Sequence, residues 1–221
     1  MNNKPATNVS RFMPYVYGWI AFLLLAHWTA VLLTLNSPNE SVATLASWFD
    51  LDREYNIPTA TSSLLLGLSS LTSLALIFQA KHFVQKMGWG LLAILFSYFA
   101  LDEILILHEQ LAKPVRKLLN ITGSNPLYHA WVVPAIGVIT FLVVVIFILR
   151  RYHKQLRVFS DILLLVAIMG VGVVMIEILG TYVYSNTEVY RIIMIPIEEV
   201  FELFMSSQIL RKLLAQRVVR K

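Results

Sequence analysis

The chain has 221 residues, of which 57% are hydrophobic and only 14% are charged. Soluble domains carry about 25% charged residues, so this composition indicates a multi-pass membrane protein with the lipid bilayer as its first partner. The absence of cysteine excludes disulfides, thiolate metal sites and cysteine nucleophiles. The net charge of +5 comes from loops and the tail rather than from a basic module interleaved with aromatics, so nucleic acid is not an expected partner.

Six apolar stretches are each long enough to cross ~30 Å of hydrocarbon as a helix. The first is too long for the apolar region of a signal peptide, and no small-residue cleavage site follows it, so we expect it to be retained. The sequence therefore predicts an all-α fold, a single transmembrane domain over residues 1–221. The six predicted helices run approximately over residues 14–35, 59–80, 88–108, 129–150, 159–184 and 190–212.

The distribution of lysine and arginine predicts the orientation of this bundle. With a cytoplasmic N-terminus, 13 of the 18 basic residues fall in cytoplasmic segments. Because basic residues are retained on the cytoplasmic side, both termini are expected there. The basic residues left on the outer side are Arg53, Lys113, Arg116, Lys117 and Arg191.

The second outer loop, over residues 109–128, contains the string Pro114-Val-Arg-Lys-Leu-Leu. This mixture of basic and apolar residues is compatible with a short amphipathic helix lying in the membrane interface. A solvated loop is the alternative.

Seven of the thirteen acidic residues lie inside, or at the edge of, the apolar stretches. A carboxylate in hydrocarbon costs ~2.5–3.5 kcal/mol, so each of them needs a partner, water or a cation. At ~1.5 Å per residue, and with the orientation above, all of them fall in the outer half of the membrane. They are Asp102, Glu103, Glu109, Glu177, Glu198, Glu199 and Glu202.

Two short strings carry most of these acids. In a continuous helix Asp102 and Glu109 share a face, and Glu103 and His108 flank it. The three glutamates of the string 198–202 fall within an arc of ~100°, so all of them can face one interior site. Like charges at this spacing repel, so some must be protonated or bridged by a cation.

Carboxylates and imidazoles from several facing helices are the ligands of carboxylate-bridged dimetal sites in helix bundles. The usual Glu-x-x-His pattern is absent here, so the known dimetal pattern is not matched. A divalent metal ion is still expected, and oxygen ligands with few nitrogens favour Mn, Fe or Ca, with Zn as a further option. Candidate metal ligands are Asp102, His108, Glu109, Glu177, Glu199 and Glu202, with His27 and His129 as weaker candidates; candidate catalytic residues are Asp102, Glu103 and Glu198.

The two histidines outside the strings have simpler alternatives. His27 is equally well explained by a hydrogen bond to a neighbouring helix. His129 lies beside Trp131 and is better explained as an interfacial residue.

The string Ala100-Leu-Asp-Glu-Ile-Leu resembles Pro196-Ile-Glu-Glu-Val-Phe, and each closes a group of three predicted helices. Such an echo is typical of two inverted halves with the site at their interface. Pro196, just ahead of the glutamate pair, is expected to break the sixth helix and to free carbonyl groups towards the site.

Five strings, in order over most of the chain, resemble a widespread group of bacterial and archaeal multi-pass membrane proteins without an established activity. The resemblance implies the architecture, the polar residue set and a place in the prokaryotic inner membrane, and it implies no reaction. The strings run over residues 48–59, 101–109, 129–131, 172–177 and 197–202.

The string Pro196-Ile-Glu-Glu is also similar to the Pro-x-Glu-Glu string of small membrane lycopene cyclases. Those enzymes use carboxylates within the membrane to protonate an isoprenoid double bond. The similarity covers one short segment, and the Asp-Glu…His-Glu string is not part of that pattern.

Three functions fit these observations. The first is a membrane enzyme, metal-dependent or acid/base, that acts on a lipid-soluble substrate such as an isoprenoid, a quinone or an acyl lipid. The second is a proton or cation transporter, which needs polar groups through the inner half, where the sequence offers little beyond Asp161. The third is a non-catalytic subunit whose acids pair with basic residues of a protein partner.

Overall fold

The computed structural model describes residues 8–36, 39–121, 130–152, 156–183 and 190–219, and these are all-α, without a strand. One π-helical turn, η2 (Tyr190–Met194), precedes the last helix. The helices are α1 (Asn8–Asn36), α2 (Glu40–Ser47), α3 (Ile57–Gln79), α4 (Phe83–Leu105), α5 (Leu107–Leu119), α6 (Val132–Tyr152), α7 (Arg157–Val183) and α9 (Ile195–Val219).

Within the described residues, five helices are long and apolar enough to cross a membrane, namely α1, α3, α4, α6 and α7. Helix α9 has 25 residues and is also long enough. It differs from the other five helices in composition, because it carries glutamates at one end and basic residues at the other. The chain is therefore a helical membrane protein, and its sixth predicted span is the one that composition alone does not support.

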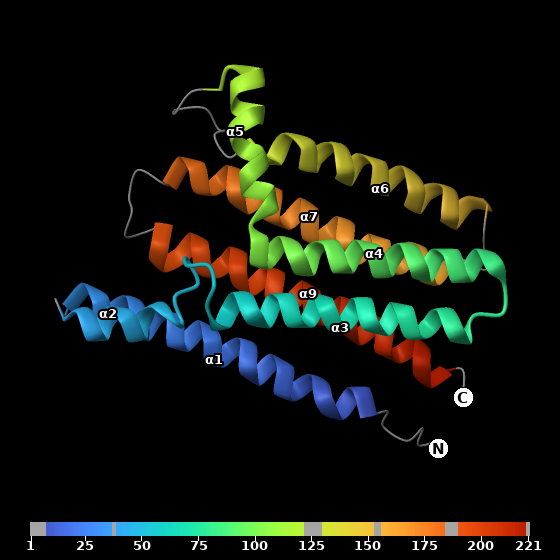
Figure 1. Cartoon of the computed structure of the whole chain (residues 1–221), viewed down its shortest axis with the longest axis horizontal. Helices are drawn as coiled ribbons and strands as arrows, with labels where there is room; N and C mark the ends of the chain where they lie inside the picture. Colours follow the sequence, from blue (N-terminus) through green and yellow to red (C-terminus); the bar gives the residue numbers. More distant parts are fainter. Residues whose placement is uncertain (1–7, 37–38, 122–129, 153–155, 184–189, 220–221) are drawn as a thin grey trace.

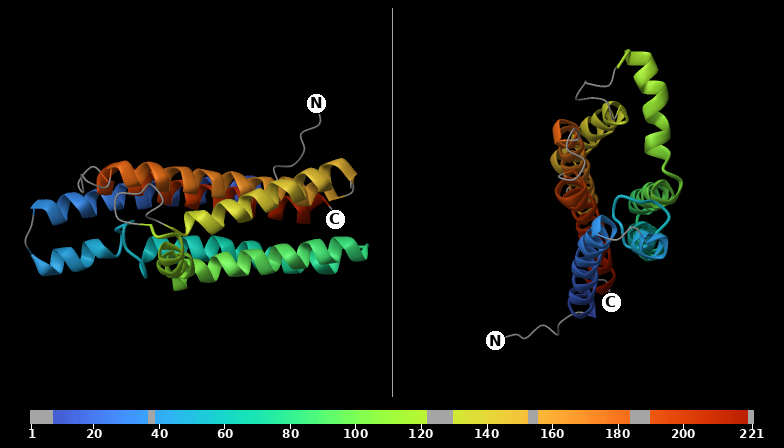
Figure 2. Two further views of the ribbon diagram at one scale, coloured as in Figure 1. Left: turned by 90° about the horizontal axis from the view of Figure 1, so that it is seen from above. Right: turned by 90° about the vertical axis from the view of Figure 1, so that its left-hand side faces the viewer.

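Helix α9 lies at the centre of the bundle, because α1, α3 and α7 all pack on it. Helix α4 packs on α3, and α6 packs on α7, so the helices form a curved row with α4 and α6 at its two ends (Figure 1 and Figure 2). Helix α1 packs mainly on α9 and α2, and it is also joined to α3 by a hydrogen bond from Trp19 Nε1 to Thr61 Oγ1 at 3.2 Å. The two inverted halves stay a prediction.

The half of the bundle next to the α3–α4 connection is closed by apolar side chains. Trp89 is fully buried, and its ring centroid lies 4.5 Å from that of Phe159, so α4 and α7 touch there. At the same end, Asp161 accepts hydrogen bonds from Arg150 Nη2 at 2.9 Å and from Lys212 Nζ at 3.3 Å. These contacts tie α6, α7 and α9 together and leave the opposite half, towards α5, as the half with room for a site.

The predicted third span differs from the structure at its end. Helix α4 ends at Leu105, because Ile106 takes the left-handed backbone conformation, with φ 53° and ψ 45°. Helix α5 then starts in a new direction and runs crosswise to the bundle (Figure 1). Residues 102 and 109 therefore do not share the face of one continuous helix, which corrects the sequence-based prediction.

Three local features complete the comparison with the sequence. The segment predicted as the second outer loop contains a helix, α5, as one of the two alternatives predicted, whereas α2, in the segment before α3, was not predicted. Pro196 follows directly on the π-helical turn η2, and because it lacks an N–H it leaves the carbonyl of Ile192, four residues earlier, free of that helical bond. This carbonyl accepts a hydrogen bond from Trp28 Nε1 of α1 at 3.1 Å, and the helix continues from η2 into α9 without a break.

The contact between α4 and α7 at the closed half leaves no space for a side chain at Gly88. A Cβ atom built there would lie 2.6 Å from the Phe159 ring, whereas Gly67 in α3 has nothing within 4 Å. Gly→Ala in a helix gains about 1 kcal/mol from propensity, while overpacking a core costs ~1–3 kcal/mol. We expect Gly67→Ala to raise the thermal unfolding midpoint in detergent and Gly88→Ala to lower it; equal shifts would contradict the close contact.

Candidate functional site

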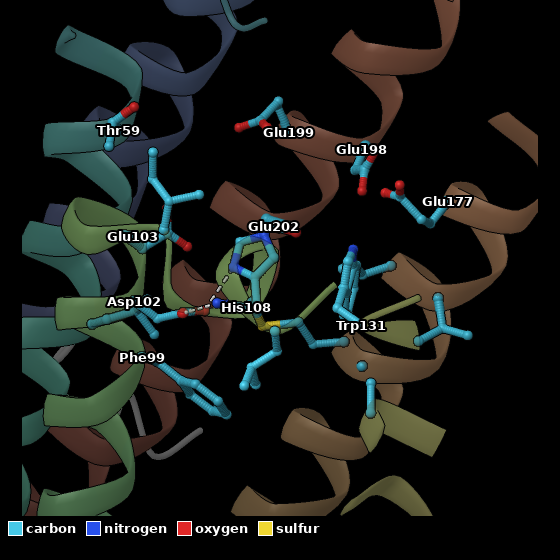
Figure 3. A pocket seen from close by; sticks show the side chains of 18 of the residues that line it. Thr59, Phe99, Asp102, Glu103, His108, Trp131, Glu177, Glu198, Glu199 and Glu202 are labelled. Carbon is cyan, nitrogen blue, oxygen red and sulfur yellow. Dashed lines mark hydrogen bonds and ion pairs between the residues drawn. The ribbon is translucent and has the colours of Figure 1, made fainter. Parts of the chain in front are cut away.

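A cavity of about 400 Å³ lies between the α3–α4 pair and the α6–α7 pair, with α9 as its floor (Figure 3). In the described part of the chain its lining contains one arginine, Arg53, and one histidine, His108. Acidic residues are far more numerous and come from four segments of the chain. They are Asp52, Glu54, Asp102, Glu103, Glu177, Glu198, Glu199 and Glu202.

Most residues singled out from the sequence meet at this cavity. The side chain of Glu109 and the whole of His129 lie outside the described residues, and His27 lies elsewhere in the structure. Sequence reasoning missed Asp52 and Glu54, whose only signal was the excess of acids in the loop before α3. The predicted residues that line the cavity are Asp102, Glu103, His108, Glu177, Glu198, Glu199 and Glu202.

The wall of the cavity towards the closed half is apolar. Phe99 lies one helical turn before Asp102 and Glu103 on α4, and Val166 and Met169 lie two to three turns before Glu177 on α7. Leu66 of α3 and Leu142 of α6 complete this wall. The cavity therefore has an acidic end and an apolar end, with the acidic end towards α5.

Asp102 fixes the corner between α4 and α5. Its Oδ1 accepts a hydrogen bond from the backbone N–H of His108 at 2.9 Å, and its Oδ2 lies 2.9 Å from Nδ1 of the same residue (Figure 3). The His108 ring also meets the Trp131 ring edge to face, with centroids 5.2 Å apart. The imidazole is thus held in one orientation on the cavity wall by a carboxylate and an aromatic ring.

Two of the glutamates on the cavity wall are joined to neighbours on other helices. The Glu198 side chain is hydrogen-bonded to that of Glu177, which links α9 to α7. A hydrogen bond between two carboxyl groups requires a proton on one of them, because an ionised carboxylate only accepts. The Glu103 side chain is hydrogen-bonded to Ser62 of α3, whose hydroxyl can donate.

The described residues contain no group of three or more His, Asp or Glu side chains placed closely enough to hold a metal ion. The acids are instead distributed around the cavity rather than gathered at one point (Figure 3). Spacing along the sequence had indicated a shared face on each helix. It carried no information on the distance between side chains of different helices.

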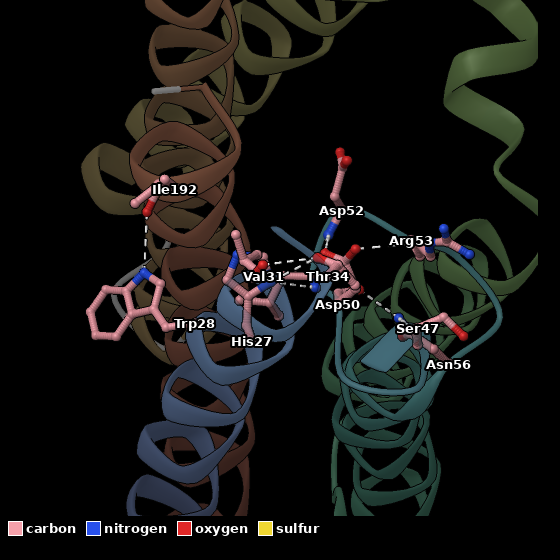
Figure 4. Close-up of polar contacts among 11 residues, drawn as sticks. His27, Trp28, Val31, Thr34, Ser47, Asp50, Asp52, Arg53, Asn56 and Ile192 are labelled. Atoms are coloured by element: carbon pink, nitrogen blue, oxygen red, sulfur yellow. Dashed lines mark hydrogen bonds and ion pairs between the residues drawn. The ribbon is translucent and has the colours of Figure 1, made fainter. Parts of the chain in front are cut away.

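His27, a weaker metal candidate, is fully buried and has a different setting (Figure 4). Its Nδ1 accepts a hydrogen bond from the Leu51 N–H at 3.0 Å and lies 3.2 Å from Oδ1 of Asp50. Asp50 in turn accepts a hydrogen bond from Asn56 on its backbone carbonyl at 2.6 Å. His27 therefore anchors the α2–α3 loop to α1, which fits its hydrogen-bonding alternative, with a loop as the partner instead of a helix.

Together the fold and the cavity define a helical multi-pass membrane protein with an acid-lined cavity in one half of its bundle. The chain belongs to the family described as a domain of unknown function (DUF8692), whose model matches residues 10–207. This match includes every residue of the cavity lining. Comparisons with curated proteins and with solved structures found no match. An uncharacterised family is what the resemblance in the sequence implied, and its description names no reaction.

The role of Asp102 at the α4–α5 corner gives a testable prediction. Removing an N-terminal capping side chain costs about 1 kcal/mol, so Asp102→Ala should loosen the first turn of α5. We expect roughly fivefold faster amide hydrogen exchange over residues 107–113, measured by mass spectrometry in detergent. Asp161→Asn, at the far end of the bundle, is the matched control and should leave this exchange unchanged. Identical exchange in Asp102→Ala and wild type would show that the corner does not depend on this carboxylate.

The anchoring role of His27 predicts a loss of stability upon its replacement. His27→Phe removes the acceptor of the Leu51 N–H and leaves that donor buried, which costs ~1–3 kcal/mol. The thermal unfolding midpoint should therefore fall. His82→Phe is the matched control, because the His82 side chain is exposed and makes no capping hydrogen bond. A midpoint equally insensitive to both substitutions would contradict the anchoring role.

Proposed function

We propose that this chain is a membrane enzyme that acts on a lipid-soluble substrate in the acid-lined cavity. The proposal rests on one observation. A single cavity contains an oriented histidine and several carboxyl groups at one end and an apolar wall at the other. The polar groups supply proton donors and acceptors. The apolar wall suits the hydrocarbon part of an isoprenoid, a quinone or an acyl lipid.

In this proposal α9 crosses the membrane as a sixth span, with both termini in the cytoplasm of a prokaryotic inner membrane. Its place between α1, α3 and α7 supports the sixth span, because these helices shield its charged residues from lipid. Leu203, Ile209 and Leu213 of α9 are fully buried. The excess of basic residues on the side of the termini supports the orientation, which makes the α5 end of the bundle the outer end.

The contacts in the cavity divide the chemical roles. Glu198 and Glu177 share a proton in their hydrogen bond, so this pair is suited to donate a proton to a bound substrate. His108 is suited to accept one, because Asp102 holds its Nδ1 and leaves Nε2 as the nitrogen for exchange with the substrate. Glu103 lies on the same wall as His108 and is the third acid/base candidate.

A divalent cation is the second component that the charges favour. The acidic residues outnumber Arg53 and His108 in the cavity lining, and their mutual repulsion falls when a cation binds among them. Glu199 and Glu202 of α9 are the central candidates for ligands. Since the acids surround the cavity, their side chains would have to move inward around an ion of Mn, Fe, Ca or Zn.

The closed half of the bundle favours an enzyme over a transporter. A path across the membrane needs polar groups along its whole length, whereas Trp89, Phe96 and Leu76 are fully buried in an apolar core below the cavity. The acids also line an internal cavity rather than an outer face of the bundle. They are therefore poorly placed to pair with basic residues of a partner subunit.

The enzyme proposal is tested by conversion of lipids. Purified protein in detergent is incubated with a total lipid extract of the cells that produced it, and the extract is compared before and after by mass spectrometry. We expect one class of lipid-soluble compound to be converted by wild type and by Glu40→Gln, which changes an exposed acid that does not line the cavity. Glu198→Gln should lose the conversion, because an amide cannot transfer the proton. Equal conversion by Glu198→Gln and wild type would overturn the assigned role.

The cation is tested by elemental analysis of the purified protein. We expect wild type and the control Glu40→Gln/Asp161→Asn to retain a stoichiometric divalent metal. Glu199→Gln/Glu202→Gln should lose it, because two central carboxylates are replaced by weaker neutral ligands. A wild type without metal would overturn this part of the proposal and leave acid/base chemistry by the protein alone.

A further inference from the structure

The cavity has an opening on the flank of the bundle between α4 and α6. These two helices stand at opposite ends of the curved row and do not pack extensively on each other. The lining residues at this place are half-exposed: Tyr98 of α4 at 45%, Leu111 of α5 at 47% and Val138 of α6 at 53%. A side chain that both lines a cavity and is half-exposed marks the mouth of that cavity.

The depth of this mouth shows which medium it faces. Tyr98 precedes the end of α4 by seven residues, and Val138 follows the start of α6 by six. At ~1.5 Å per residue, both lie about 9–11 Å inside the ends of their helices. In a chain whose helices span the bilayer, a mouth at this depth faces hydrocarbon. A second approach, past the exposed residues 52–54 of the α2–α3 loop, lies on the aqueous side.

Helix α5 borders the mouth at its outer end. It leaves α4 at Ile106 and runs crosswise to the bundle, past the start of α6 (Figure 1 and Figure 2). Leu118 is 80% exposed, and Lys113, Arg116 and Lys117 lie on the same helix. An amphipathic helix of this composition is suited to lie in the headgroup region with its apolar face towards the acyl chains. The mouth therefore opens just below the plane of the lipid headgroups.

We propose that the cavity receives a single-chain amphiphile sideways from the outer leaflet, through the mouth between α4 and α6. Its headgroup lies among the acids at the α5 end, and its chain lies along the apolar wall and extends through the mouth into the bilayer. A cavity of about 400 Å³ is near the lower end for ligand sites. It therefore holds a headgroup and the first part of a chain, while the rest of the chain remains in lipid. This inference rests on the membrane setting of the proposed function and names its substrate class.

The charges in the cavity define the headgroup. Acidic residues outnumber Arg53 and His108, so a headgroup that brings positive charge is favoured over a neutral one. An amine carries this charge itself, and a phosphate carries it through a bound divalent ion. The shared chemistry is a positive charge among carboxylates, and the experiment separates its two sources.

The experiment uses a chemical block of the mouth in the folded protein. The chain has no cysteine, so Val138→Cys provides a single attachment point on the mouth. Val144→Cys is the matched control, because Val144 is 51% exposed on the same helix and does not line the cavity. Both variants are reconstituted in phosphatidylcholine vesicles, and each is tested with and without modification by a bulky, lipid-soluble maleimide. Because the bulky group is attached to the folded protein, the test does not require a bulky substitution that would have to fold.

The probe is a photoactivatable long-chain alkylamine, compared with the alcohol and the phosphate of the same chain. We expect the amine to label residues of α4 and α6 that line the cavity, and the label to be lost after modification of Val138→Cys but not of Val144→Cys. Labelling that survives the block at Val138→Cys, or that never reaches the cavity, overturns the side route. Equal labelling by the alcohol overturns the charge selection.

The phosphate probe separates the two sources of charge. Labelling by the phosphate only when Mn²⁺ is added supports a charge carried by the metal, and labelling by the amine without metal supports a charge carried by the headgroup. If the phosphate labels the cavity as strongly as the amine in the absence of metal, both proposed sources of the positive charge are overturned. Site labelling without any lipid conversion would retain this inference and overturn the catalytic proposal, so the two failures are distinguishable.

Discussion

The energetic cost of carboxylates in hydrocarbon is the constraint on which this structure depends. Helix α9 carries three glutamates within five residues and cannot present them to lipid without a cost of several kcal/mol. It therefore occupies the centre of the bundle, with α1, α3 and α7 around it. Helix α6, which carries no acid and whose basic residues lie only in its last turn, stands at the rim, where exposure of its apolar side chains to lipid costs nothing. The order of the helices in space thus follows from where the charges can be tolerated.

The same constraint explains the polar face of α3. Ser62, Ser69 and Ser73 are buried, and α3 packs on both α4 and α9. Small hydroxyl side chains let helices approach closely and supply hydrogen bonds within the membrane without adding charge. Ser62 is hydrogen-bonded to Glu103, so part of this face also serves the cavity. Packing and site are therefore built from the same residues on this helix.

The sequence predicted five of the long apolar helices and the position of most acids that line the cavity, because both leave local signals. A run of apolar residues long enough to cross the bilayer predicts a span, and an acid inside that run predicts an inward direction. The break at Ile106 had no such signal. A β-branched residue rarely takes positive φ, and no glycine, proline or asparagine marks the position. The break is stabilised by Asp102, whose side chain bonds the backbone of His108 beyond it. Such a contact is visible only once the chain has turned.

The set of candidate metal ligands illustrates a second limit of sequence reasoning. Periodicity gives the direction of a side chain around its own helix, but ligand geometry depends on the distance between helices, which is set by packing. Here the acids of α4, α7 and α9 are distributed over the walls of one cavity, and Glu177 of α7 meets Glu198 of α9 in a hydrogen-bonded pair. The acids of the α2–α3 loop were missed for a related reason. They reach the cavity through the anchor between His27 and Leu51, a contact between residues 24 positions apart in a segment without periodicity.

The cavity lies at the wide end of a wedge-shaped space between two helix pairs, α3–α4 and α6–α7. At the cytoplasmic end in the proposed orientation, the contact of Trp89 with Phe159 brings α4 against α7, and the bare backbone at Gly88 permits that approach. At the α5 end, α4 and α6 do not pack extensively on each other within the described residues, and α4 turns away into α5 at Ile106. The helix pairs therefore diverge towards the outer leaflet, and the mouth is a consequence of where the bundle is tight.

A ligand chain in the wedge would contact the upper surface of the apolar core at Leu142 and Val166, which belong to both the core and the cavity lining. Binding and packing would then be coupled through these two side chains, without any rearrangement of the closed half.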